Sequence, residues 1–343
     1  MTQTLDDLSL ILIYSAMGVY ALAFIAFTLD LARRSSTVKK AVAEDVPVAV
    51  GAGVSGASGS VLSKGGSGGS GDSGDSADSL VSLEGRDSSG RRSLALRLGV
   101  VFTVLAFVIQ LAGVILRGIA AARVPWANMY EFSITGTVLI VAVFLVLLLR
   151  EDLRFLGTFV TGLVLVLLGV STINYYVAIS PLPPALQSAW LVIHVLVAIL
   201  GTAFFALGGA LSIIQLLQTR GDAMGRLSAA LRLRFLRTLP DADSLERLAY
   251  RVNIVGFVFW TFTLIAGAIW AERAWGRYWG WDTKEVWTFI IWVIYAGYIH
   301  ARATRGWRGS RSAWLAIVGF AAVLFNFGVV NVFFKGLHAY SGL

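Results

Sequence analysis

Long apolar runs separated by short polar segments dominate the chain. A helix that spans a membrane needs about 20 consecutive, mostly apolar residues, and eight runs have about this length. They are Leu8–Leu31, Leu94–Leu116, Phe132–Leu149, Phe155–Tyr176, Ala189–Leu217, Ala249–Ala271, Lys284–Ala303 and Ala313–Phe334. The pattern predicts an all-α polytopic membrane protein with about eight transmembrane helices.

Composition supports this interpretation and excludes a water-soluble domain. Of the 343 residues, 57% are hydrophobic and 14% are charged, whereas soluble domains carry about 25% charged residues. The chain contains no cysteine, which excludes a disulfide, a thiolate nucleophile and a cysteine-bound metal within this chain.

Charge predicts the orientation of the chain in the membrane. The first run follows Asp6 and Asp7 and precedes Arg33 and Arg34, so we interpret it as an anchor with its amino terminus outside. With alternating loops, 22 of the 28 Lys and Arg residues fall inside, as the positive-inside rule requires. We therefore expect both termini outside. The net charge of +8 indicates contact with membrane lipid and not with nucleic acid.

The six remaining basic residues fall in or beside the predicted outer loops. They are Arg117, Arg123, Arg273, Arg277, Lys284 and Lys335.

The sequence divides into three segments. Residues 1–32 are the first transmembrane anchor. Residues 33–93 are rich in Gly, Ser and Asp and predict a flexible cytoplasmic linker, because they cannot bury enough apolar surface to offset the entropy lost on ordering. Residues 94–343 form the predicted seven-helix domain, with a short amphipathic helix at Leu227–Leu236 along the inner surface.

Residues 275–287 form the most informative loop, which we expect on the outer side. Four of the 11 tryptophans lie here: Trp275, Trp279, Trp281 and Trp287. An aromatic belt at the membrane interface is one explanation. A second is a binding site for a planar, apolar ligand, because aromatic faces stack on such ligands and glycines such as Gly276 let a ligand approach the backbone.

Polar residues of the same loop have structural and functional interpretations. Asp282 and Glu285 have the spacing of a capping box for the next helix, which would hold the loop rigidly. Arg273, Arg277 and Lys284 have the charge to neutralise acidic groups on a ligand or to contact lipid headgroups.

All three histidines lie at membrane depth or at its rim. His194 lies just inside the outer surface, His338 follows the last run on the same side, and His300 ends the seventh run near the inner surface. Without cysteine, histidine is the obvious iron ligand, and haem iron takes axial histidine readily. The outer pair with the tryptophan loop indicates a haem site. His300 lies most of a bilayer away, too far to bind the same iron.

The loop resembles the tryptophan-rich WWD motif of haem-handling proteins, and the whole arrangement resembles the CcsA/ResC-type (system II) cytochrome c biogenesis proteins. The matching residues are Trp275, Gly276, Trp279, Trp281, Asp282, Lys284, Glu285 and Trp287. The resemblance covers the first run and the chain from about Val100 onward. Asn128–Phe132 resembles a further family hallmark, although it also fits a helix entry with Glu131 near the positive end of the dipole.

The resemblance implies the cargo, the partners and the residues that bind. It implies that the WWD loop, His194 and His338 bind haem b as a carried substrate on the outer face, with His300 as an axial ligand nearer the cytoplasm. It also implies a ResB/Ccs1-type membrane partner and presentation of haem to the CxxCH motif of apocytochrome c.

These implications leave more than one function open. The chain is interpreted as a subunit of a holocytochrome c synthase (haem lyase) in the plasma membrane, or in a thylakoid-type membrane, and no catalytic residue is assigned. One alternative is a haem exporter or chaperone without synthase activity. Another is a proton-coupled transporter of a different solute, with histidines as proton relays.

Overall fold

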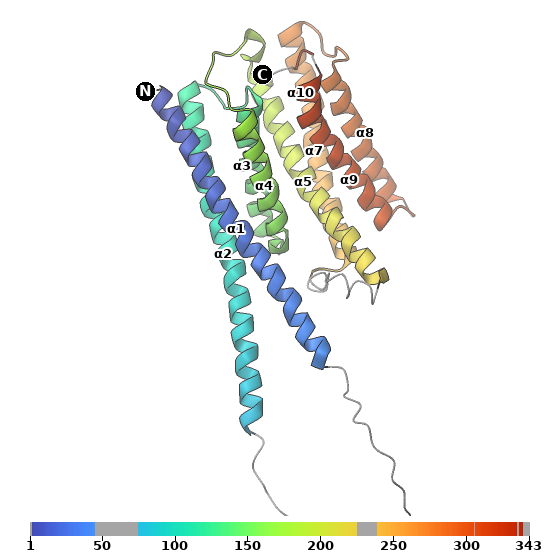
Figure 1. The fold of residues 1–343 in the computed structure, drawn as a ribbon. Coiled ribbons are helices and arrows are strands. Elements are labelled where there is room, and N and C mark those ends of the chain that lie inside the picture. Colours follow the sequence, from blue (N-terminus) through green and yellow to red (C-terminus); the bar gives the residue numbers. More distant parts are fainter. Residues whose placement is uncertain (1, 45–74, 225–238, 305, 335, 339–343) are drawn as a thin grey trace, which may run out of the picture.

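Each of the eight apolar runs of the sequence becomes helical (Figure 1). The computed structural model describes residues 2–44, 75–224, 239–304, 306–334 and 336–338, and these contain no strand. The α-helices are α1 (Thr2–Glu44), α2 (Asp75–Ala121), α3 (Met129–Leu148), α4 (Gly157–Asn174), α5 (Ala189–Met224), α7 (Ala242–Trp275), α8 (Thr283–Ala303), α9 (Ser310–Phe325) and α10 (Asn331–Phe333). Two 3₁₀ turns, η1 (Arg154–Leu156) and η2 (Pro184–Leu186), and a π-helical turn, η4 (Asn326–Val330), complete the elements.

Among the described residues, seven helices are long and apolar enough to cross a membrane. The predicted all-α polytopic membrane fold is confirmed, with seven such helices where we expected about eight. The exception is α8, which forms at the predicted place with 21 residues. Its charged ends and its four Trp and Tyr residues lower its mean hydropathy, because hydropathy scales rank these aromatic residues as weakly polar. It nevertheless packs against α7 and α9.

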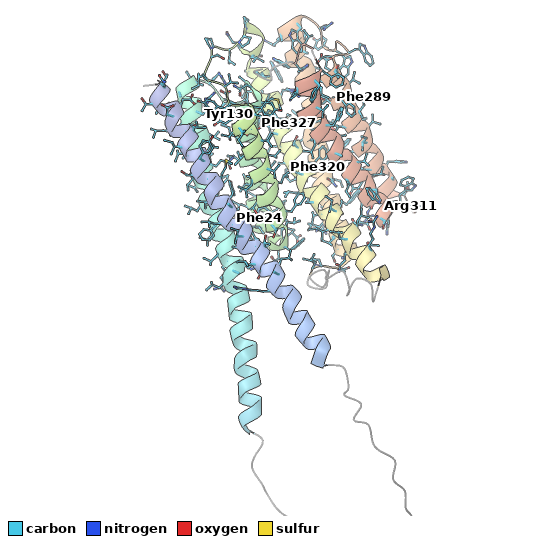
Figure 2. The ribbon with its side chains drawn as sticks, in the orientation of Figure 1. Phe24, Tyr130, Phe289, Arg311, Phe320 and Phe327 are labelled. Carbon is cyan, nitrogen blue, oxygen red and sulfur yellow. The ribbon has the colours of Figure 1, made fainter. Side chains whose placement is uncertain are left out.

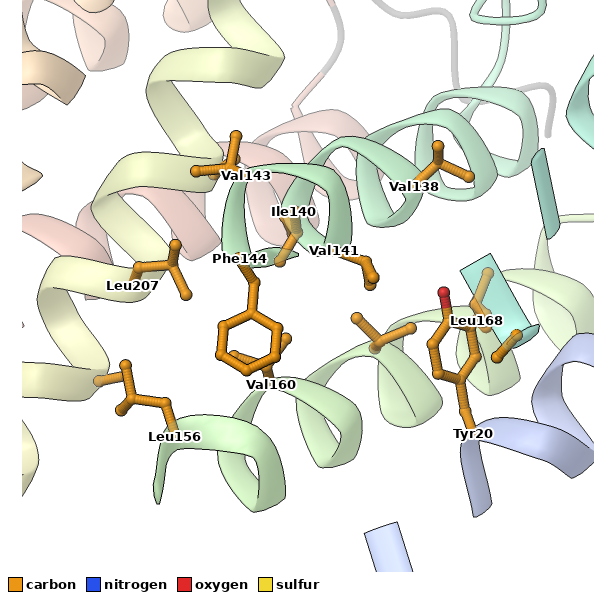
Figure 3. Packing of buried hydrophobic residues seen from close by; sticks show 14 of the residues in the cluster. Tyr20, Val138, Ile140, Val141, Val143, Phe144, Leu156, Val160, Leu168 and Leu207 are labelled. Carbon is orange, nitrogen blue, oxygen red and sulfur yellow. The ribbon is translucent and has the colours of Figure 1, made fainter. Parts of the chain in front are cut away.

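The helices form two neighbouring groups that share α5 and α7. One apolar cluster joins α1 to α5 with the first turns of α7, and in it Phe144, Val160 and Leu207 point toward one another (Figure 3). A second cluster joins α5, α7, α8 and α9 around Phe205 and Tyr295, whose rings stack 3.5 Å apart. The central position of α5 brings the predicted ligand His194, in its first turns, between the two groups.

Helices α1 and α2 pack side by side and diverge away from the loop-rich end (Figure 1). Their backbone is helical as far as Glu44 and from Asp75 onward, so helix extends into both ends of the predicted linker. Adding a residue to an existing helix is easier than starting a new one, which accounts for the extension. Residues 45–74 lie outside the described residues, as does the predicted helix Leu227–Leu236.

Three connections lie at the end of the bundle where α1 begins: residues 122–128, 175–188 and 276–282. The turn that follows α10 lies at the same end (Figure 1). The tryptophan loop and His338 therefore come together, as the alternating helices predict. Which side of the membrane this end faces stays a prediction.

Candidate functional site

A cavity lies at the loop-rich end, between α3, α5, α7, α8 and α9. Its volume is about 190 Å³. The side chains around it include His194, Trp270, Trp279, Lys284 and His338. Two histidines 144 positions apart in the sequence thus line one largely apolar cavity.

The first of these histidines is held by α7. Nδ1 of His194 lies 3.0 Å from the carbonyl oxygen of Thr263, so Nδ1 carries the proton and Nε2 keeps its lone pair. The ring stacks on Trp270, with centroids 5.7 Å apart and planes 18° apart. Gly267 lies against the imidazole, because a Cβ at that position would come within 2.8 Å of the ring. Contacts from α7 therefore fix both the tautomer and the orientation of His194.

The second histidine is held by the aromatic loop. Nδ1 of His338 donates to Oδ2 of Asp282 at 2.7 Å, and Oδ1 of Asp282 accepts from the Leu337 backbone N–H at 3.2 Å. The hydrogen bond from His338 holds the pKa of the Asp282 carboxyl below its ordinary value of 3.8. Because the carboxylate is an acceptor only, Nδ1 is the donor, and Nε2 is again the nitrogen left for a metal.

Tryptophans of the loop divide into two groups. Trp275 makes edge contacts with Trp270 at 4.7 Å and with His338 at 4.9 Å, and Trp279 lines the cavity. Trp281 is 77% exposed, and Trp287 packs on Phe325 at 4.3 Å. Of the four predicted tryptophans, Trp275 contacts His338 and Trp279 lines the cavity, whereas Trp281 and Trp287 do neither.

The glycines and acidic residues of the loop shape its backbone. Gly276 ends α7 in the left-handed conformation, with φ of 68°, which glycine adopts without strain. The predicted capping box of Asp282 and Glu285 is confirmed. Oε2 of Glu285 accepts from the backbone N–H of Asp282 at 3.1 Å and of Gly280 at 2.8 Å. The loop is thus tied to the start of α8, as expected.

His300 lies apart from this cavity. It is an exposed residue in the last turn of α8, whereas Lys284 in the first turn lines the cavity. The sixteen positions between them correspond to about 24 Å of helix. In Figure 2, Phe289 of α8 lies near the loop-rich end and Arg311, at the start of α9, lies toward the opposite end. The structure agrees with the expectation that His300 binds no iron in common with the other two histidines.

The Asn128–Phe132 stretch forms one wall of the cavity. Asn128 caps α3 by accepting from the Glu131 backbone N–H, and Phe132 stacks on Phe327 at 5.2 Å. Both residues line the cavity. The helix-entry interpretation of this stretch is therefore correct, and the same residues also face the site.

Glu131 has a larger role than its position on the helix predicts. It is fully buried and pairs with Arg117 of α2 and with Arg123, and Arg117 also pairs with Asp6 of α1. Oε2 of Glu131 accepts from the Ala127 backbone N–H at 3.0 Å. We counted Arg117 among the outer basic residues, but the structure buries it as the centre of an ion cluster.

Sequence reasoning missed Trp126 and Trp270 at the cavity. Asn326 stands out as a polar residue within an apolar run, which favours a helix–helix hydrogen bond, but it lines the cavity. The described residues contain no group of three or more His, Asp or Glu side chains that would hold a bare metal ion. Two histidines suit an iron whose other ligands come from a macrocycle.

Comparison with known families matches residues 126–338 of the chain to the model described as cytochrome C assembly protein. The matched region begins at the loop before α3 and ends at His338. It contains every residue that we assign to the cavity.

Individual relatives carry the name cytochrome c biogenesis protein CcsA. The protein of Parasynechococcus marenigrum is 39% identical over 178 residues, which cover 47% of this chain and 58% of the relative. That of Synechococcus elongatus is 40% identical over 197 residues, covering 47% and 61%. That of Guillardia theta is 35% identical over 242 residues, covering 66% and 80%. The chain thus spans less than two thirds of the first two relatives and four fifths of the third.

Proposed function

Because the chain belongs to the cytochrome c assembly protein family, we propose that it acts in cytochrome c maturation, as a membrane subunit that presents haem to apocytochrome c. One observation carries the proposal: His194 and His338 line a single cavity, and each has its Nδ1 held by a hydrogen bond. Both rings therefore offer Nε2 to an iron. Fixed second partners of this kind orient a histidine and raise its basicity as a ligand.

The surroundings of the two imidazoles suit haem b. The cavity wall is largely apolar, and Trp270 contacts both histidine rings. Indole faces and edges pack well on a flat aromatic macrocycle. At about 190 Å³ the cavity is smaller than typical ligand pockets of roughly 300 Å³ or more, so haem binding requires the cavity to widen.

In the proposed attachment reaction, the thiols come from the CxxCH motif of the apocytochrome. Each S–H adds across one vinyl C=C bond of haem, with sulfur on one carbon and hydrogen on the other, so no oxidant is needed. This chain has no cysteine to compete with the substrate. Its contribution is to hold haem still near the thiols, and proximity alone lowers a barrier by several kcal/mol.

We place this reaction at the outer face of the plasma membrane. Haem reaches the cavity from the cytoplasmic side, where His300 is exposed at the end of α8. The resemblance to the CcsA/ResC-type proteins implies that a ResB/Ccs1-type partner supplies the second ligand for haem at His300, and this chain has no fourth histidine that could take that place. The positive-inside distribution of charge supports this orientation.

The test is attachment by the purified complex of this chain with its ResB/Ccs1-type partner. Haem and an apocytochrome peptide with a CxxCH motif are added, and the peptide mass is measured. We expect a covalent haem–peptide adduct, and none with a peptide that has serine for both cysteines. Transfer of haem without a covalent adduct would favour the haem chaperone over the synthase.

A further inference from the structure

One wall of the cavity is polar, and the aromatic site described above does not account for it. Lys284 and Thr288 of α8 line it together with Asn326 and Asn331. Both asparagines belong to the region where α9 passes through the π-helical turn η4 into α10. Such π-helical turns are frequent at functional sites, and this one contains Phe327, which stacks on Phe132 and is labelled in Figure 2.

Lys284 brings an amino group to this wall and forms no ion pair with a carboxylate of the described residues. Its Nζ donates to Oδ1 of Asn331, a neutral partner. None of the ion pairs between described residues includes Lys284. Its acidic neighbours are engaged elsewhere: Asp282 accepts from His338 and Leu337, and Glu285 accepts from backbone N–H groups. An ammonium group has three donors, so Lys284 has donors left for a ligand.

Asn326 provides a second, independent sign of a missing partner. Its side chain is buried, with 5% of the residue exposed, and it lines the cavity. Its Oδ1 has no hydrogen-bond partner within the part of the chain that the structure describes. Its Nδ2 has only a long contact of 3.4 Å with Oγ1 of Thr288. A buried amide left in this state is costly unless a ligand completes its hydrogen bonds.

We propose that Lys284 and Asn326 form a subsite for a carboxylate of the cargo, which under the proposed function is a propionate of haem. Asn331 positions the ammonium, because its Oδ1 accepts from Lys284 while its Nδ2 donates to the Phe327 carbonyl oxygen at 2.9 Å. The ammonium supplies charge-assisted hydrogen bonds, and the amide of Asn326 contributes Nδ2 after a half-turn about its terminal bond. Two other cations of the region, Arg273 and Arg277, are exposed and do not line the cavity. Of the three basic residues that the sequence offers to neutralise acidic groups on a ligand, only Lys284 lines the cavity.

The subsite gives the cavity a preference for free carboxylates and fixes the orientation of the bound macrocycle. Anchoring the propionate edge at the α8–α9 wall fixes how the macrocycle is turned in its own plane. It also selects porphyrins with free carboxylates over their esters, because an ester cannot balance the charge on Lys284.

The experiment compares ferric haem with its dimethyl ester by absorbance titration of the purified full chain. We expect the wild type to bind haem about 10- to 100-fold more tightly than the ester, the range for hydrogen bonds to a charged group. Lys284→Met should remove this preference and leave ester binding in place. Arg277→Met is the matched control, since it removes an exposed positive charge of the same loop, and it should keep the preference.

A second variant tests the subsite independently, in case Lys284→Met does not fold. Asn331→Asp gives Lys284 an internal counter-ion and should also abolish the preference while ester binding persists. A preference that survives in both variants would overturn the subsite, as would equal binding of haem and ester by the wild type. If the wild type binds neither compound, the proposed function itself fails, which is a distinguishable result.

Discussion

At the scale of single residues, the hydrogen bond at Nδ1 is what makes each cavity histidine a suitable ligand. Thr263 holds His194 through a backbone carbonyl, and Asp282 holds His338 through a carboxylate. A carboxylate is the stronger of these two kinds of acceptor. The hydrogen bond to Asp282 should therefore contribute more to haem binding by His338 than the hydrogen bond to the Thr263 carbonyl contributes to haem binding by His194.

Asp282→Asn removes the charge but keeps the shape of this partner. We expect haem affinity to fall about 10- to 100-fold, the usual cost of losing such an outer hydrogen bond, as measured by absorbance titration. The control is Asp241→Asn, which alters another helix-capping aspartate away from the cavity. Equal loss of affinity in both variants would contradict the role given to Asp282.

The same pair predicts a pH dependence of stability. The folded-state pKa of Asp282 is lowered, chiefly by the hydrogen bond from His338. The carboxylate therefore contributes stability that is complete above its ordinary value of 3.8 and is lost as the pH falls through its lowered folded-state value. The difference in unfolding temperature between the wild type and Asp282→Asn should thus become smaller in acid. A difference in unfolding temperature that stays constant below pH 3.8 would contradict this linkage.

At the scale of elements, the contact between α5 and α7 positions His194. These two helices pack closely, and Gly267 leaves the space that the imidazole occupies. The sequence placed His194 correctly in the first turns of its helix. It did not reveal the tautomer or the neighbours of the ring, because these depend on the rotation of α7 against α5.

Gly267→Ala should therefore displace the ring. The added Cβ would lie 2.8 Å from the imidazole, so either His194 turns or the helices separate. We expect weaker haem binding in an absorbance titration, with the chain still folded. Gly297→Ala makes the same change in α8 at a position with open space around it and should leave binding unchanged. Wild-type affinity in Gly267→Ala would show that His194 is not constrained from α7.

At the scale of the whole molecule, a buried ion cluster joins the first two helices to the region matched by the family model. Asp6 of α1, Arg117 of α2 and Glu131 of α3 meet in it. Apolar runs predicted all three helices, because length and hydrophobicity suffice for that. The cluster was not predicted, because an arginine at the end of an apolar run reads as an exposed loop residue unless its partners from other helices are known.

Arg117→Met should destabilise the bundle by about 3–5 kcal/mol, the usual cost of breaking a buried pair and leaving its carboxylates unpaired. Thermal unfolding in detergent measures the change. The control is Arg154→Met, because Arg154 pairs with Asp152 at an exposed site and such pairs contribute about 1 kcal/mol or less. Similar unfolding temperatures for the two variants would contradict a clamping role for the cluster.

The central claim is that His194 and His338 bind one iron in one cavity. The most direct measurement is the absorption spectrum of ferric haem bound to the purified chain, in a His300→Ala background that leaves only this pair. The account predicts a low-spin spectrum with two histidine ligands, which changes to high spin when either His194 or His338 is replaced by alanine. An unchanged spectrum in both single variants, or no bound haem in the parent protein, would contradict it.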